Sequence, residues 1–192
     1  MDSPLHLAVI GAWECAIAGV AVTYLSGPIT TGPRLLESLR AGESLDERTV
    51  IDENSRDMRV IAERLRGRGG IVVEPGSLSV VGWSQQDYLA LWEAFIGRFA
   101  TEVVFMPGWE FSAGCAREFA CAMECELPTR ALVGSPIGLE EGWASLAAAL
   151  EELEPYQKHP AIPRVLSAID EAIKRLAKVR TLVARTREQL DG

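Results

Sequence analysis

Two short segments of the chain carry the residue types that could perform chemistry. Residues 24–29 read as a strand that runs into a turn at Gly27, and residues 112–118 read as a turn that opens a helix. The second segment places Glu118 on the second turn of that helix. Such a carboxylate can attack an anomeric carbon and hold the sugar as a covalent ester while the base leaves. We therefore expect Glu118 to be a nucleophile. The alternative is an exposed helical glutamate, the usual place of that residue.

The start of the same helix could hold an anion. Ser112 can cap the helix, and the free backbone amides around Gly114 can bind a negatively charged group. A plain helix cap is the simpler interpretation, and it is compatible with anion binding. At Gly27 the lack of a side chain would let the backbone approach a ligand closely, although most glycine turns after a strand only turn the chain.

Three cysteines near Glu118 raise the question of a metal site. Cys121 and Cys125 are four residues apart and could share a helix face, and Cys115 lies one turn before the glutamate. Zinc ligands usually come from separate turns, and neither histidine of the chain is close in sequence. We therefore expect buried, unreactive thiols, with no metal and no organic cofactor.

Composition limits the classes of function. The chain has 192 residues, a net charge of −8 and 48% hydrophobic residues, as expected for one globular domain with an appendage. Its negative field disfavours nucleic acid and anionic membranes as partners. The four cysteines form no disulfide framework, which favours a cytoplasmic protein. The apolar stretch at residues 5–25 could be a signal or membrane segment, but Glu14 and the acidic start argue against both.

The order of elements predicts the fold class. Strands are expected at residues 20–26, 71–74, 102–106 and 130–133, with helices at 51–66, 84–99 and 112–126 between them. Strands that alternate with helices predict an α/β fold, a Rossmann-like or flavodoxin-like parallel sheet flanked by helices. Ligands bind such sheets beyond the carboxyl ends of the strands. Gly27 and Glu118 both fall there.

The remaining segments extend this domain. A helix at residues 5–18 begins at a polar cap and a proline and forms an N-terminal unit, residues 1–19. Residues 20–137 form the α/β domain, in which 27–47 read as a long loop. Residues 138–192 form a C-terminal helical extension, with helices at 139–153 and 164–190 and a proline-bearing linker at 155–163. The last helix has a long apolar stripe, so we expect a homo-oligomer.

The two segments together resemble a known family. Tyr-Leu-Ser-Gly-Pro on the first strand and Pro-Gly-Trp-Glu-x-Ser-x-Gly-x-x-x-Glu after the third are similar to the nucleoside 2-deoxyribosyltransferase-like superfamily, which includes 2′-deoxynucleoside 5′-phosphate N-hydrolases. The similarity covers roughly residues 20–133. It implies that Glu118 is the catalytic nucleophile. It also implies that Ser112 contacts a 5′-phosphate, because the nucleoside transferases tend to carry an acid there.

The resemblance assigns further residues to the site. Gly27, Pro28 and Ile29 match the loop around the sugar, with Ser26 at its start, and Tyr24 matches a strand tyrosine near the pocket. A second acid usually acts near the departing base, and Asp87 is the candidate, although it could simply support the start of its helix. Trp83 and Trp109 could stack on a base or fill the core.

The first loop departs from the family pattern. Thr30 and Thr31 stand where the hydrolases carry an arginine and a glycine, and Arg34 is the candidate to replace that arginine. We therefore expect an enzyme that cleaves or transfers the N-glycosidic bond of a (deoxy)nucleoside or its 5′-monophosphate. The alternative is a non-catalytic nucleotide sensor or an oligomeric scaffold of the same fold.

Overall fold

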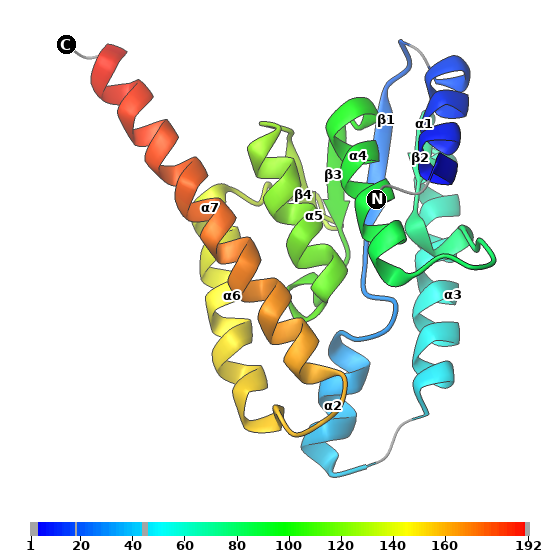
Figure 1. Ribbon diagram of the computed structural model, residues 1–192, viewed down its shortest axis with the longest axis vertical. Coiled ribbons are helices and arrows are strands. Elements are labelled where there is room, and N and C mark those ends of the chain that lie inside the picture. Colours follow the sequence, from blue (N-terminus) through cyan, green and yellow to red (C-terminus); the bar gives the residue numbers. More distant parts are fainter. Residues whose placement is uncertain (1–3, 18, 44–45, 191–192) are drawn as a thin grey trace.

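Four parallel strands form one sheet in the order β2-β1-β3-β4 (Figure 1). The computed structural model describes residues 4–17, 19–43 and 46–190. The strands are β1 (Val22–Ser26), β2 (Ile71–Val73), β3 (Glu102–Phe105) and β4 (Thr129–Ala131). The chain first adds a strand on one side of β1 and then returns to its other side. This is the flavodoxin-like strand order, and its switch point lies between β1 and β3.

The predicted helices are present with shifted ends, and one further helix, α2 (Pro33–Ala41), was not predicted. The others are α1 (Pro4–Ala16), α3 (Glu47–Arg66), α4 (Gln85–Phe99), α5 (Ala113–Glu124), α6 (Leu139–Leu153) and α7 (Ile162–Leu190), with short 3-10 helices η1 (Pro75–Ser77), η2 (Trp109–Phe111) and η3 (Glu154–Tyr156). The α/β class with a parallel sheet is therefore confirmed. The predicted cap at Asp2 and Ser3 lies outside the described residues.

The prediction of one long loop at residues 27–47 was wrong, because α2 lies within it. Pro33 occupies the first turn of this helix, and Gly32 before it has a φ of 97°. Gly42 ends the helix in the left-handed conformation, with a φ of 68°. Proline at the start and glycine just past the end are ordinary helix boundaries, so residues that looked like loop punctuation delimit a short helix.

The two faces of the sheet have separate cores. Leu25, Met58 and Val104 pack together under α3 on one face. Tyr24, Phe105 and Phe119 belong to a larger core on the other face, which α4 and α5 cover. Because side chains alternate along a strand, Tyr24 and Ser26 point to the α5 side while Leu25 points to the α3 side.

The C-terminal helices pack directly on the α/β unit. Leu146 of α6 and Ile169 and Leu176 of α7 are fully buried and share the core of α4 and α5. Arg175 of α7 forms ion pairs with Glu124 and Glu93, at 2.6 and 3.2 Å. The predicted extension therefore forms an outer layer over α5. Figure 1 shows the end of α7 projecting beyond this layer, away from the sheet.

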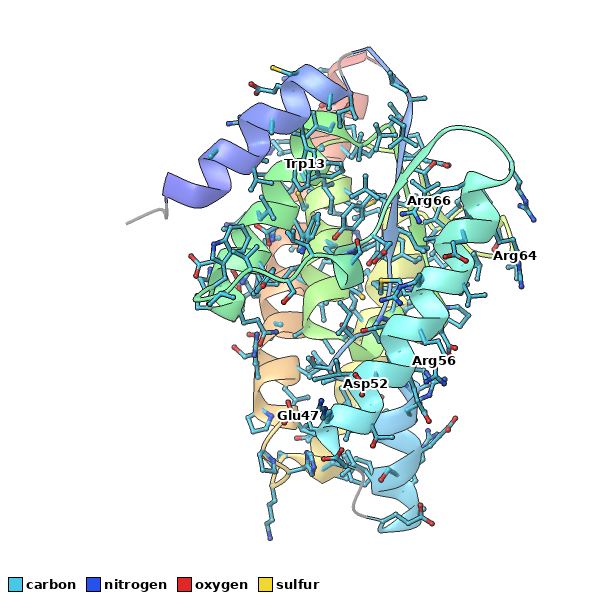
Figure 2. All side chains as sticks on the ribbon, turned by 90° about the vertical axis from the view of Figure 1, so that its right-hand side faces the viewer. Trp13, Glu47, Asp52, Arg56, Arg64 and Arg66 are labelled. Carbon is cyan, nitrogen blue, oxygen red and sulfur yellow. The ribbon has the colours of Figure 1, made fainter. Side chains whose placement is uncertain are left out.

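The N-terminal helix α1 packs against α4. Trp13 of α1 stacks on Trp92 of α4 with ring centroids 5.8 Å apart, and Figure 2 shows it over that part of the molecule. Across the described ranges, no helix is both long and apolar enough to cross a membrane.

Candidate functional site

The carboxylate of Glu118 is held by two hydroxyl groups of β1. Tyr24 donates a hydrogen bond to Oε1 at 2.7 Å, and Ser26 donates one to Oε2 at 2.5 Å. Tyr24 and Ser26 are two residues apart on one strand, so both side chains reach the face on which α5 lies. Both oxygens of the carboxylate are therefore oriented by a rigid element of the fold.

Burial changes the acidity of this carboxyl. Glu118 is only 5% exposed. Removal from water raises the pKa of Glu118 above its usual value, while the hydrogen bonds from Ser26 and Tyr24 oppose that rise. Burial and the nearby Glu118 charge also raise the pKa of the Tyr24 hydroxyl well above its ordinary range. Tyr24 therefore remains a protonated donor to the carboxylate at neutral pH.

Glu118 lies in the wall of a pocket at the carboxyl edge of the sheet. The pocket has a volume of about 380 Å³. Its lining includes Ser112 and Gly114 from the start of α5 and the apolar side chains of Ile51 and Trp92. A volume of this order falls within the range for small-molecule sites, roughly 300–1,000 Å³. Among the described residues that line it, Glu118 supplies the carboxylate.

Ser112 stands at the N-terminal boundary of α5, as predicted, but its hydroxyl does not cap the helix. No hydrogen bond joins its side chain to the first-turn amides. Ser112 is nevertheless buried and lines the pocket, together with Gly114. Its hydroxyl is in hydrogen-bond contact with the Cys115 thiol, so a ligand at this helix start would meet that hydroxyl together with the first-turn amides.

Gly27 and Ile29 line the pocket, as the sequence suggested. The closest neighbours of Gly27 are protein side chains, because a Cβ atom there would meet Met106 and Met58. The need for glycine at this turn is therefore set at least partly by the core beneath α3. Pro28 lines a separate hollow together with Met106.

Arg34 is not brought to the pocket. Its guanidinium donates to Asn54 and Asp57, each at 2.5 Å, and pairs with Glu53 at 3.0 Å. All three partners lie on α3, and Arg34 lines the same separate hollow as Pro28. Its charge is paired with the carboxylates of Asp57 and Glu53, so the structure places Arg34 in this separate hollow and not in the lining of the Glu118 pocket.

The two candidate tryptophans also lie outside the pocket lining. Trp109 is buried between aromatic rings, with centroids 4.9 Å from Phe105 and 4.8 Å from Phe119. Trp83 packs against Tyr88 at 5.1 Å. The sequence left base stacking and core packing open for both tryptophans, and Trp109 packs in the core. Trp92, which the sequence analysis did not select, contributes the aromatic surface of the pocket.

Asp87 forms a capping box with Ser84 at the start of α4. Its carboxylate accepts hydrogen bonds from the Ser84 backbone amide at 2.7 Å and from the Ser84 hydroxyl at 2.6 Å. The lining of the pocket at this helix comes instead from Gln85, Tyr88, Leu89 and Trp92. These residues face the pocket because they follow the helical period of α4, a signal that the sequence contains.

The cysteines have different surroundings. Cys115 lines the pocket and is buried, and burial together with the Glu118 charge raises its pKa above the usual value for a thiol. It therefore stays protonated, which makes it a poor nucleophile. Cys121 is also buried, and Cys125 is exposed. In the described part of the chain, no three His, Cys, Asp or Glu side chains are grouped as a metal site would require.

Comparison with known protein families finds a match to part of this chain. Residues 48–130 match the model of a family described as a domain of unknown function, DUF4406. The match runs from the first turn of α3 into β4, so it includes Ser112 and Glu118 but not β1 or α7. No curated protein and no solved structure gives a significant match to the chain.

Proposed function

We propose that the protein cleaves or transfers the N-glycosidic bond of a (deoxy)nucleoside or its 5′-monophosphate, with Glu118 as nucleophile. The observation that carries the proposal is the pair of hydrogen bonds from Tyr24 and Ser26 to this buried carboxylate. Burying a carboxyl group at this depth costs stability, which favours a functional reason for its presence. Perturbed acidity in a concave site is typical of catalytic groups.

The pocket suits a nucleoside. The apolar walls, which include Trp92 and Leu89, would receive the flat base. Glu118 would face C1′ of the sugar, and Ser112 with the first amides of α5 would receive the 5′ end. The motif resemblance to the nucleoside 2-deoxyribosyltransferase-like superfamily supports the same orientation.

The reaction would proceed in two displacements. An Oε atom of Glu118 attacks C1′, a C1′–O bond forms, and the C1′–N bond breaks with its electron pair leaving on the base. The departing base takes up a proton from water. In hydrolysis, water then attacks C1′, its proton passes to solvent or to a neighbouring base, and the carboxylate is regenerated. In transfer, the nitrogen of a second base replaces the water.

One experiment tests the proposal directly. The protein is incubated with a panel of ribo- and deoxyribonucleosides and their 5′-monophosphates, and free base is measured by chromatography. Release of base that disappears in Glu118→Gln supports the proposal. No release from any substrate, with or without an acceptor base, would favour the non-catalytic sensor or scaffold instead.

A further inference from the structure

A second pocket adjoins the first at the carboxyl edge of the sheet. It also has a volume of about 380 Å³, and Thr30 and Gln85 line both pockets. Ala113, the first residue of α5, lines the second pocket, whereas Ser112 and Gly114 line the first. The start of α5 therefore lies at the boundary between the two.

The C-terminal part of the chain supplies an arginine and a histidine to the lining of this second pocket. Arg164, near the start of α7, and His159, just before that helix, both line it. Figure 1 shows the connection between α6 and α7 at the end toward which the β3 arrow points. The outer helical layer thus reaches the edge of the sheet at which ligands of such folds bind.

Arg164 is oriented toward the boundary between the pockets. Its Nη1 donates a hydrogen bond to Oε1 of Gln85. Unlike Arg34, which pairs with two carboxylates, Arg164 has a neutral residue as this hydrogen-bond partner. A guanidinium has five donors and suits the oxygens of a phosphate.

His159 and Thr31 add polar groups. The Ala161 amide donates to Nδ1 of His159 at 3.3 Å, which leaves Nε2 as the protonated nitrogen of the neutral ring and therefore a donor. Thr31 lines the same pocket and is 5% exposed. Among the described residues its buried hydroxyl oxygen has no hydrogen-bond partner, which is unusual for such a group.

We infer that the second pocket is a subsite for the phosphate of a nucleoside 5′-monophosphate, and that Arg164 and His159 determine this specificity. The inference rests on the proposed function, since the first pocket would hold the sugar and base. In this chain, α7 would provide the arginine that the first loop lacks at Thr30 and Thr31. Substrate recognition would then depend on the C-terminal helices.

A negatively charged residue in the second pocket allows a second test of phosphate binding, with the opposite expected effect. Glu47, at the first turn of α3, also lines the second pocket, and Figure 2 shows it at the lower end of that helix. A carboxylate there repels an anion. If a phosphate binds here, removing the charge of Glu47 must strengthen its binding, while removing that of Arg164 must weaken it.

The experiment measures equilibrium binding of a nucleoside 5′-monophosphate and the matching nucleoside by calorimetry, with the Glu118→Gln chain as background so that turnover does not interfere. Arg164→Ala should weaken monophosphate binding about tenfold, the lower end for a charge-assisted contact because Arg164 is exposed. Nucleoside binding should be unchanged. Glu47→Gln should tighten monophosphate binding and leave nucleoside binding unchanged.

A matched control lies on the same helix. Arg180 pairs with Glu140 at 2.9 Å, and at 1.5 Å per residue it lies about 24 Å farther along α7. Arg180→Ala removes the same charge from the chain and should leave both affinities unchanged. If both arginine variants weaken monophosphate binding equally, the effect comes from the overall charge of the protein, and the subsite is overturned.

The outcomes separate the inference from the proposed function. Equal affinity of Arg164→Ala and its parent for the monophosphate overturns the subsite, even if base release proves the enzyme. Conversely, charge-dependent monophosphate binding at Arg164 and Glu47 supports the subsite even if no base is released by the native chain. Inorganic phosphate that competes with the monophosphate, but not with the nucleoside, supports it further.

Discussion

The hydroxyl of Tyr24 and the carboxylate of Glu118 meet at 2.7 Å although 94 residues separate them in the chain. The contact joins the first strand to the helix that follows the third strand, across the switch point of the sheet. Parallel pairing of β1 with β3 brings these elements together.

Glu118→Gln should abolish base release, by about three orders of magnitude or more, because an amide cannot act as the nucleophile. It should not destabilise the fold at neutral pH. The folded pKa of Glu118 is raised, so its contribution to stability is full below the unfolded pKa and is lost as pH rises through the folded pKa. Ionisation of the glutamate therefore lowers stability as pH rises, and glutamine, which does not ionise, removes this loss.

Thermal unfolding of both proteins across pH checks this prediction. The melting temperature of Glu118→Gln should equal or exceed that of the parent at pH 7, and the difference should narrow in acid. Near-normal turnover in the variant would exclude Glu118 as nucleophile.

Tyr24→Phe and Ser26→Ala should each move the acid limb of the pH–activity profile to higher pH. Each change removes a hydrogen bond that favours the ionised form of Glu118, so the pKa of this carboxyl rises further. The profile of kcat/KM against pH is the measurement. Thr23→Val serves as the control, because Thr23 on the same strand binds Glu102 instead. An unshifted acid limb in both variants would contradict the predicted coupling.

Ser112→Ala should raise KM for a 5′-monophosphate more than for the matching nucleoside. Losing one hydrogen bond to a charged group costs about 1.5–3 kcal/mol. Since the Ser112 side chain makes no helix-cap hydrogen bond, the melting temperature should stay nearly constant. Steady-state kinetics on both substrates decide the matter. An equal rise in KM for both would show that Ser112 does not contact the phosphate.

Asp87→Ala should lower stability by about 0.5–2 kcal/mol and leave kcat nearly unchanged, because its carboxylate serves the capping box of α4. Denaturant unfolding and turnover are measured together. Loss of the alkaline limb of the pH profile, with stability preserved, would instead identify Asp87 as the acid near the departing base that the family resemblance implies.

We expect the protein to self-associate through the end of α7. The first part of the apolar stripe is buried on α5 and α6, but Leu182 and Val183 are 62% and 41% exposed. They line a groove of about 730 Å³ with Met123 and Leu127. A second copy of the chain, presenting the same helix end, would cover this surface.

Light scattering on the full chain tests this prediction. The parent should be larger than a monomer at micromolar concentration, and Leu182→Asp with Val183→Asp should reduce it to a monomer. Ser167→Asp, at an exposed position near the start of α7, should leave the assembly intact. A monomeric parent would rule out the interface.

The sequence alone determined the local features of this protein. Alternating strand and helix patterns predicted the parallel sheet, and the spacing of Ser112, Gly114 and Glu118 placed these residues at the start of one helix. Both signals are short in range, because helix boundaries and periodicity depend on neighbouring residues. The identity of Glu118 as the leading candidate needed no tertiary contact.

Only the tertiary structure decided which distant side chains share a site. Arg34 is five residues from Ile29 in the chain, yet three acceptors on α3 hold it away from the pocket. Arg164 is 46 residues beyond Glu118, yet the packing of α7 on α5 brings it to the adjoining pocket. Such placement depends on helix packing and on competition among ion-pair partners, which are long-range properties that no local pattern encodes.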